Sequence, residues 1–172
     1  FIFALFSGIC LIFAIRVKGI LLTHYDCFSH WLTVVRELLT KNALPNFESE
    51  IITFASYPTG TAGFIYYFCK ILGRSTDSLV LLGQDILLAA SILPFAAFVK
   101  KKTIGGIVTV FCAMFYSIIS NTFTDTPAAE LLVDTLVSTL AFSSLAIIIY
   151  YRDDLFRAAF LSLPLQVFLI AV

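Results

Sequence analysis

Long apolar runs separated by short polar breaks form the main pattern along the chain. A helix needs about 20 residues to cross the ~30 Å hydrocarbon core of a bilayer. Runs that suit this length are residues 1–22, 78–99, 103–120 and 133–151, and a fifth begins near Ala158 and continues over 158–172. We therefore predict an all-α fold, a polytopic transmembrane helical bundle of four to five spans within a single domain.

The loop 23–77 lies between the first two spans, and its first part, residues 23–58, is the most informative stretch of the chain. Apolar side chains recur in it at helical spacing, at Phe28, Trp31, Leu32, Val35, Leu38 and Leu39. Polar residues lie between them, which predicts an amphipathic helix in the membrane interface. If the helix starts early, Asp26, His30, Thr33 and Glu37 could form one polar stripe. The helix should end within residues 42–45.

The segment Thr59–Gly73 allows two interpretations. It is apolar but short, contains Lys70 and ends at a glycine typical of a helix stop. It could cross the membrane, which would leave residues 23–58 in the cytoplasm. It could instead lie half-embedded, which would leave that loop outside.

Composition agrees with a membrane protein. Hydrophobic residues make up 60% of the chain and charged residues 13%, whereas soluble domains have roughly 45–50% and 25%. This excludes a disordered chain, a basic nucleic-acid binder and an ordinary soluble enzyme. Lys and Arg total 11, as do Asp and Glu, so net charge selects no partner. The expected partner is the lipid bilayer, with no nucleic acid.

Basic residues predict which connections lie inside. Lys100–Lys102 separates two apolar runs, and Arg152 and Arg157 mark a later turn. Such clusters favour the cytoplasmic side, whereas residues 121–132 contain no Lys or Arg and should lie outside. Both chain ends fall within apolar runs, so we expect a fragment of a longer membrane protein. Cys27 and Cys69 could share a loop, where they either pair or remain free.

Asp26 is the first candidate for chemistry. It follows an apolar span and has His24 and His30 as neighbours. A carboxylate partly removed from water at a membrane surface can act as a proton acceptor. The alternative is that Asp26 only caps the following helix. The His24-x-Asp26-x3-His30 spacing also allows a metal site, although such spacings often arise by chance.

Further acids lie at the outer end of the later spans. Asp125, Glu130 and Asp134 occur with no basic residue nearby, and Glu130 and Asp134 would share one helix face. Acids at a membrane boundary without a cation suggest a functional site; alternatively they face water and keep the loop soluble. Asp85 lies inside its span beside Gln84, where we expect a structural polar contact.

Three segments carry a resemblance to a known family. They are His24-Tyr-Asp-Cys-Phe-Ser-His-Trp31, then Ser56-Tyr-Pro-Thr-Gly60, and Leu131-Leu-Val-Asp134. The chain resembles integral-membrane glycosyltransferases of the GT-C superfamily, which use polyprenyl-phosphate sugars and include protein mannosyltransferases, aminoarabinose transferases and oligosaccharyltransferase catalytic subunits. Thr59 stands where the closest bacterial pattern has a second proline. Neither outer loop contains a DxD motif, which disfavours a divalent cation as cofactor.

The resemblance implies a fold, a reaction and a set of residues. The first loop would be extracytoplasmic, the helix after the Tyr57 turn would be juxtamembrane, and the protein would reside in a bacterial plasma membrane. It would move a sugar from a lipid-linked phosphate donor to an unknown acceptor, with inversion. Asp26 would be the base and Asp134 its partner, with substrate contacts from His30, Arg36, Tyr57, Asp125 and Glu130. The rival hypotheses are a transporter or permease component and a non-catalytic membrane subunit.

Overall fold

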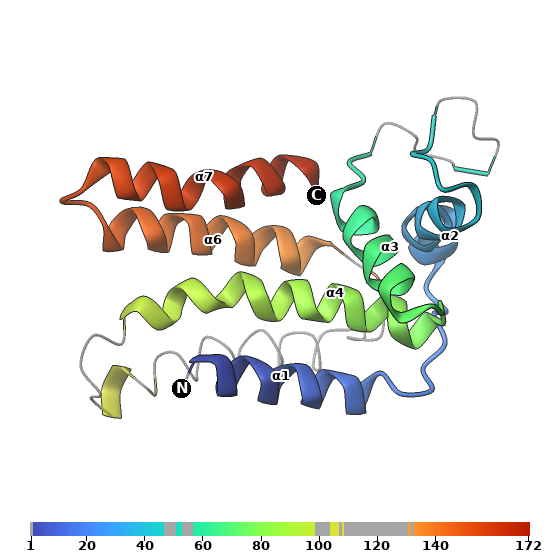
Figure 1. Cartoon of the computed structure of the whole chain (residues 1–172), viewed down its shortest axis with the longest axis horizontal. Coiled ribbons are helices and arrows are strands. Elements are labelled where there is room, and N and C mark those ends of the chain that lie inside the picture. Colours follow the sequence, from blue (N-terminus) through green and yellow to red (C-terminus); the bar gives the residue numbers. More distant parts are fainter. Residues whose placement is uncertain are drawn as a thin grey trace.

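Four apolar helices run side by side along the long axis of the molecule (Figure 1). The computed structural model describes residues 2–46, 51–52, 57–98, 104–106, 108, 131 and 133–172. The four helices are α1 (Ile2–Arg16), α4 (Asp77–Ile92), α6 (Asp134–Tyr150) and α7 (Leu155–Ala171). Contacts join α1 to α4, α4 to α6, and α6 to α7. Every element of regular secondary structure in the described residues is a helix, which confirms the all-α prediction for this part of the chain.

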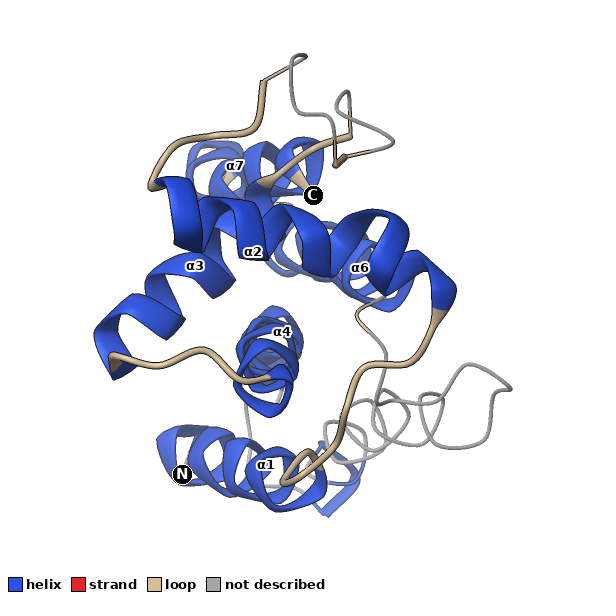
Figure 2. Cartoon of the chain, turned by 90° about the vertical axis from the view of Figure 1, so that its right-hand side faces the viewer, coloured by secondary structure: helices blue, strands red, loops and turns tan. Residues whose placement is uncertain are grey.

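The long segment between α1 and α4 forms a layer across one end of these helices. It contains a π-helical turn η1 (Cys27–Trp31), α2 (Leu32–Lys41) and α3 (Gly60–Leu72). α2 lies crosswise to α4, as Figure 2 shows with α4 viewed end-on. A core of buried residues joins this layer to the bundle; among its members are Leu22, Leu32, Val35, Ile65, Cys69 and Leu81.

Local sequence signals explain where these helices end. Asn42 adopts the left-handed region with φ 51°, and its N–H bonds Leu38 O at the end of α2. Gly73 adopts the same left-handed conformation at the end of α3, with φ 66°, and its N–H bonds Cys69 O and Lys70 O. Both stops were expected from the sequence, because Asn and Gly tolerate this backbone conformation best. α4 gives way at Leu93 to a 3₁₀ segment, η2 (Leu93–Phe98), because Pro94 has no N–H to continue the α-helical pattern.

Two of the expected boundaries require correction. The first span was predicted over 1–22, but α1 ends at Arg16, and Gly19 then turns the chain with φ 77°. The last helix was expected from near Ala158, but α7 begins at Leu155. The reason is that the Asp154 carboxylate accepts a hydrogen bond from Arg157 N, 3.1 Å away, and so caps the helix. The predicted span 103–120 lies mostly outside the described residues.

One described helix, continuous over Asp77–Ala96, is long and apolar enough to cross a membrane. α1, α6 and α7 are apolar but shorter. α3 has 13 residues, about 20 Å at 1.5 Å per residue, which is short of a ~30 Å hydrocarbon core. It also lies at the end of the bundle beside α2 (Figure 1). Of the two interpretations of this segment, the geometry favours a helix that does not span.

Candidate functional site

Asp26 stands at the start of the crosswise layer, immediately before η1. Its side chain makes no capping hydrogen bond, so the interpretation of Asp26 as a helix cap is wrong. The carboxylate is half-exposed, and its Oδ2 lies 3.6 Å from His24 Nδ1. A carboxylate that is reachable from solvent and not committed to the backbone remains available to accept a proton.

Hydrogen bonds from the first turn of α4 hold the loop segment that leads to Asp26. The Asp77 Oδ2 atom accepts a hydrogen bond from Leu22 N, 3.2 Å away. The Ser78 hydroxyl accepts one from Gly19 N at 3.1 Å and donates one to Ile20 O at 3.2 Å. These three bonds tie residues 19–22 to the bundle, so the position of Asp26 follows from α4 rather than from a free loop.

Asp77 also holds Arg36, one of the residues expected to contact substrate. Arg36 Nη2 donates to Asp77 Oδ1 at 3.2 Å, which brings α2 to the start of α4. The charge of Arg36 is therefore already balanced by a carboxylate. Asp77 is not among the candidate residues that the sequence pattern indicated. Its position in Thr76-Asp77-Ser78, ahead of an apolar run, is a recognisable helix-start signal that would have found it.

His30 and Tyr57 are brought together from positions 27 residues apart in the sequence. The His30 ring is buried and packs edge-to-face against Tyr57, with ring centres 4.8 Å apart, and against Trp31 at 4.5 Å. Burial lowers the pKa of the His30 imidazole, which favours the neutral form of the ring. Tyr57 remains exposed, which makes it the member of this aromatic group that a ligand can reach directly.

The predicted polar stripe is wrong as a surface feature. His30 and Glu37 are buried rather than exposed, and the Glu37 carboxylate accepts a hydrogen bond from Lys41 Nζ at 2.5 Å. Glu37 belongs to the buried face of α2, together with Val34 and Leu38, and His30 lies in the π-helical turn that precedes α2. The Thr33 hydroxyl bonds Phe28 O, 2.6 Å away, over this turn.

Asp134, the second acidic candidate, lies at the same end of the bundle as Asp26. Asp134 is the first residue of α6 and is exposed. Leu131, three residues earlier, is buried, and its N–H donates to Cys27 Sγ at 3.4 Å. Because Cys27 directly follows Asp26, the segments that carry Asp26 and Asp134 touch. Asp125 and Glu130 lie outside the described residues.

The structure tests two further predictions, a Cys27–Cys69 disulfide and a metal site at His24, Asp26 and His30. Cys27 and Cys69 are both buried and are not joined by a disulfide, so the pairing considered from the sequence is not formed. In the described ranges, no three His, Cys, Asp or Glu side chains gather closely enough to hold a metal ion. His24 and Asp26 do approach each other, but His30 turns into the core.

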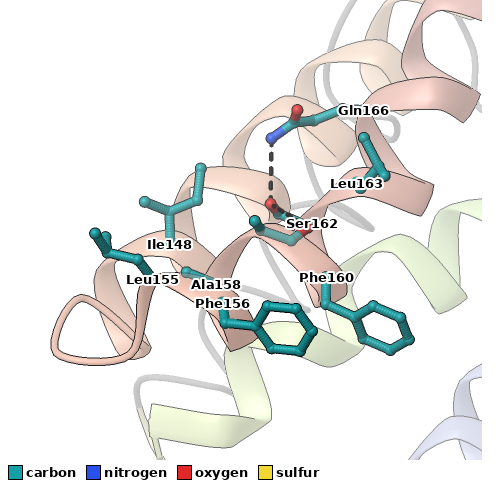
Figure 3. A pocket seen from close by; sticks show the side chains of 9 residues that line it. Ile148, Leu155, Phe156, Ala158, Phe160, Ser162, Leu163 and Gln166 are labelled. Carbon is teal, nitrogen blue, oxygen red and sulfur yellow. Dashed lines mark hydrogen bonds between the residues drawn. The ribbon is translucent and has the colours of Figure 1, made fainter.

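An apolar groove of about 500 Å³ lies between α6 and α7 (Figure 3). Hydrophobic side chains form most of its wall, and Ser162 and Gln166 hydrogen-bond to each other at 3.2 Å on one side. Its lining includes Leu155 and Phe156, next to the turn between the two helices, and this turn lies at the opposite end of the bundle from α2 and α3 (Figure 1). It contains none of the residues expected to act on a substrate.

Comparison of the chain with protein-family models, curated proteins and solved structures gave no match.

Proposed function

We propose that this protein is a membrane glycosyltransferase that moves a sugar from a lipid-linked phosphate donor to an acceptor at the extracytoplasmic face. The observation that carries the proposal is the Leu131–Cys27 hydrogen bond of 3.4 Å. Each partner lies within three residues of an acidic position, Asp26 or Asp134. Two carboxylates from distant parts of the chain thereby belong to one end of the bundle, where a single substrate could meet both.

The distribution of polar and apolar side chains supports a polytopic membrane bundle. Ser143, Ser144 and Ser162 are buried, whereas neighbouring phenylalanines such as Phe142, 64% exposed, and Phe156, 80% exposed, face outward. In water this arrangement is the reverse of the usual one. In a bilayer, outward apolar side chains contact lipid and small polar residues pack between helices. On this proposal α1, α6 and α7 span together with α4.

Hydrogen bonds between the helices fit the same environment. The Ser91 hydroxyl of α4 donates to Thr139 Oγ1 of α6 at 2.8 Å, and the Ser143 hydroxyl bonds Ser91 O. Gln166 Nε2 of α7 donates to Ser144 Oγ of α6 at 3.2 Å. Such bonds satisfy polar groups that find no water inside a bilayer.

The proposed reaction is a single inverting displacement. The acceptor oxygen attacks the anomeric carbon while the bond from that carbon to the phosphate oxygen breaks, and the phosphate leaves with the bonding electrons on the opposite face. The Asp26 carboxylate takes the proton from the acceptor. Asp134 would orient the acceptor, and the exposed ring of Tyr57, held by His30, would contact the substrate. Arg36 would contribute indirectly through Asp77, because its charge is already paired.

The test is sugar transfer by the complete membrane protein that contains these residues, reconstituted in liposomes with a polyprenyl-phosphate sugar and candidate acceptors. We expect labelled sugar to move from lipid to acceptor. The transporter alternative is favoured by Asp85, a buried acid within the helix long enough to span. Uptake of a labelled solute without sugar transfer would support the transporter. Binding of the donor lipid with neither transfer nor uptake would indicate a non-catalytic subunit.

The proposal also predicts the orientation of the two ends of the bundle. Ser75 lies next to α3, whereas Asp153 lies in the turn between α6 and α7, and both are exposed. In a protein without the four native cysteines, Ser75→Cys should react with an impermeant maleimide added outside the cell. Asp153→Cys should react only after permeabilisation. Cysteines at positions 48 and 124 should label from the same side as position 75. Labelling of Ser75→Cys and Asp153→Cys from one side would contradict the arrangement.

A further inference from the structure

We infer that the outer face of α3 binds the anionic surface of the bilayer through a patch of exposed apolar and cationic side chains. The patch consists of Tyr67, Lys70, Ile71, Leu72 and Arg74. The inference rests on the membrane location in the proposed function, but not on sugar transfer.

The two faces of α3 differ sharply in burial. Thr61, Ala62, Ile65 and Cys69 pack inward, so the helix is held by one face. On the other face Tyr67 is 67% exposed and Ile71 is 83% exposed. Residues 67, 70 and 71 are spaced by three and four positions, which places them together on a helix surface. Large apolar side chains this exposed, next to a cation, are typical of a helix that lies in a membrane interface.

The two cations of the patch are not balanced by acids. Lys70 Nζ lies 5.5 Å from the centre of the Tyr66 ring, and within the part of the chain that the structure describes neither Lys70 nor Arg74 forms an ion pair. By contrast, Arg36 is paired with Asp77, and Lys41 with Glu37. The patch therefore carries two positive charges that an anionic headgroup would complement.

The position of the patch along the chain fits the headgroup level. Arg74 precedes by three residues the helix that is long and apolar enough to cross a membrane, which begins at Asp77. Cations that flank a spanning helix extend to the phosphate layer, while their aliphatic parts stay with apolar neighbours. α3 lies across the end of the bundle beside α2 (Figure 2). Its outer face would thus meet the bilayer surface alongside the bundle.

The experiment measures how deeply this patch enters the bilayer. The full chain, with its native cysteines replaced and an environment-sensitive fluorophore attached at Ser75→Cys, is reconstituted in nanodiscs. One set contains phosphatidylcholine alone, and another also contains phosphatidylglycerol. We expect emission at shorter wavelength and higher intensity in the phosphatidylglycerol discs, and a loss of that difference in high salt. Inorganic phosphate added to phosphatidylcholine discs should cause no shift; a shift of equal size would mean that the patch binds free phosphate instead.

Variants assign the effect to the patch. Lys70→Gln with Arg74→Gln should abolish the difference between the two lipid compositions. The matched control is Arg152→Gln with Arg157→Gln, which removes two positive charges from the other end of the bundle and should leave the difference intact. Tyr67→Ser with Ile71→Ser should shift emission to longer wavelength in both kinds of disc.

Equal emission from the parent protein in both lipid compositions would overturn the inference, as would persistence of the difference in Lys70→Gln with Arg74→Gln. Sugar transfer is measured on the same preparations. A parent protein that responds to phosphatidylglycerol but transfers no sugar would contradict the proposed reaction and leave the lipid-binding patch standing. Sugar transfer without any response to phosphatidylglycerol would contradict the lipid-binding patch and leave the proposed reaction standing.

Discussion

Replacing Asp26 with asparagine should reduce sugar transfer by a factor of about 10²–10⁴, the usual contribution of a positioned general base. Asparagine has nearly the same shape but cannot accept the acceptor's proton. The carboxylate of Asp26 makes no capping bond, so its loss should leave η1 and α2 intact. The measurement is the initial rate of transfer from a polyprenyl-phosphate sugar in liposomes, at matched amounts of inserted protein.

Asp153→Asn is the matched control for this change. It removes the same group from a side chain that is 96% exposed, in the turn at the far end of the bundle. We expect transfer by this variant to equal that of the parent protein. An Asp26→Asn protein that transfers sugar at the parent rate would remove Asp26 from the role of base. Equal losses in both variants would mean that transfer depends on overall charge rather than on this carboxylate.

Replacing Gly60 with alanine should destabilise the fold by roughly 1–3 kcal/mol, the usual cost of overpacking. A Cβ added at Gly60 would lie 2.5 Å from Ala171 O and 2.9 Å from its carbonyl carbon. These are backbone atoms at the end of α7, so they cannot turn aside as a flexible side chain would. Thermal unfolding in detergent, followed by the loss of helical signal, should show a lower midpoint.

For Gly63→Ala, in the same helix, we expect no loss of stability. A Cβ at Gly63 would meet nothing within 4 Å, and alanine favours the helical backbone over glycine by about 0.5–1 kcal/mol. The unfolding midpoint should therefore stay the same or rise. A midpoint for Gly60→Ala as high as that for Gly63→Ala would show that α3 and α7 do not approach closely in solution.

This contact gives a physical reason for the glycine in Tyr57-Pro58-Thr59-Gly60. Pro58 and Gly60, two positions apart, are typical of a turn that redirects the chain into the next helix. The structure adds that a backbone segment more than a hundred residues later lies against Gly60. Turn chemistry is local and visible in the sequence. A close approach between two backbones depends on how α3 and α7 pack, and no local signal reports it.

The amphipathic pattern of residues 28–39 illustrates a different limit. It correctly predicted a helix that ends at Asn42, because apolar periodicity and a left-handed stop are properties of adjacent residues. It correctly placed Leu32, Val35 and Leu38 on the buried face, but it did not predict the π-helical turn at Cys27–Trp31 or the burial of His30 and Glu37. Whether a turn adopts this geometry depends on the neighbours of Cys27 and His30, which include Leu131 and Tyr57.

The sequence by itself determined the all-helical class of the described residues and most of the helix stops, because hydrophobic spacing, glycine and asparagine act over a few residues. It also singled out Asp26 and Asp134 as chemical candidates. Only the tertiary structure decided which side chains meet. It joined Arg36 to Asp77 and Leu131 to Cys27, partners 41 and 104 residues apart. Such contacts depend on how whole helices pack against one another. The pattern of residues along one helix does not indicate which other helix lies beside it.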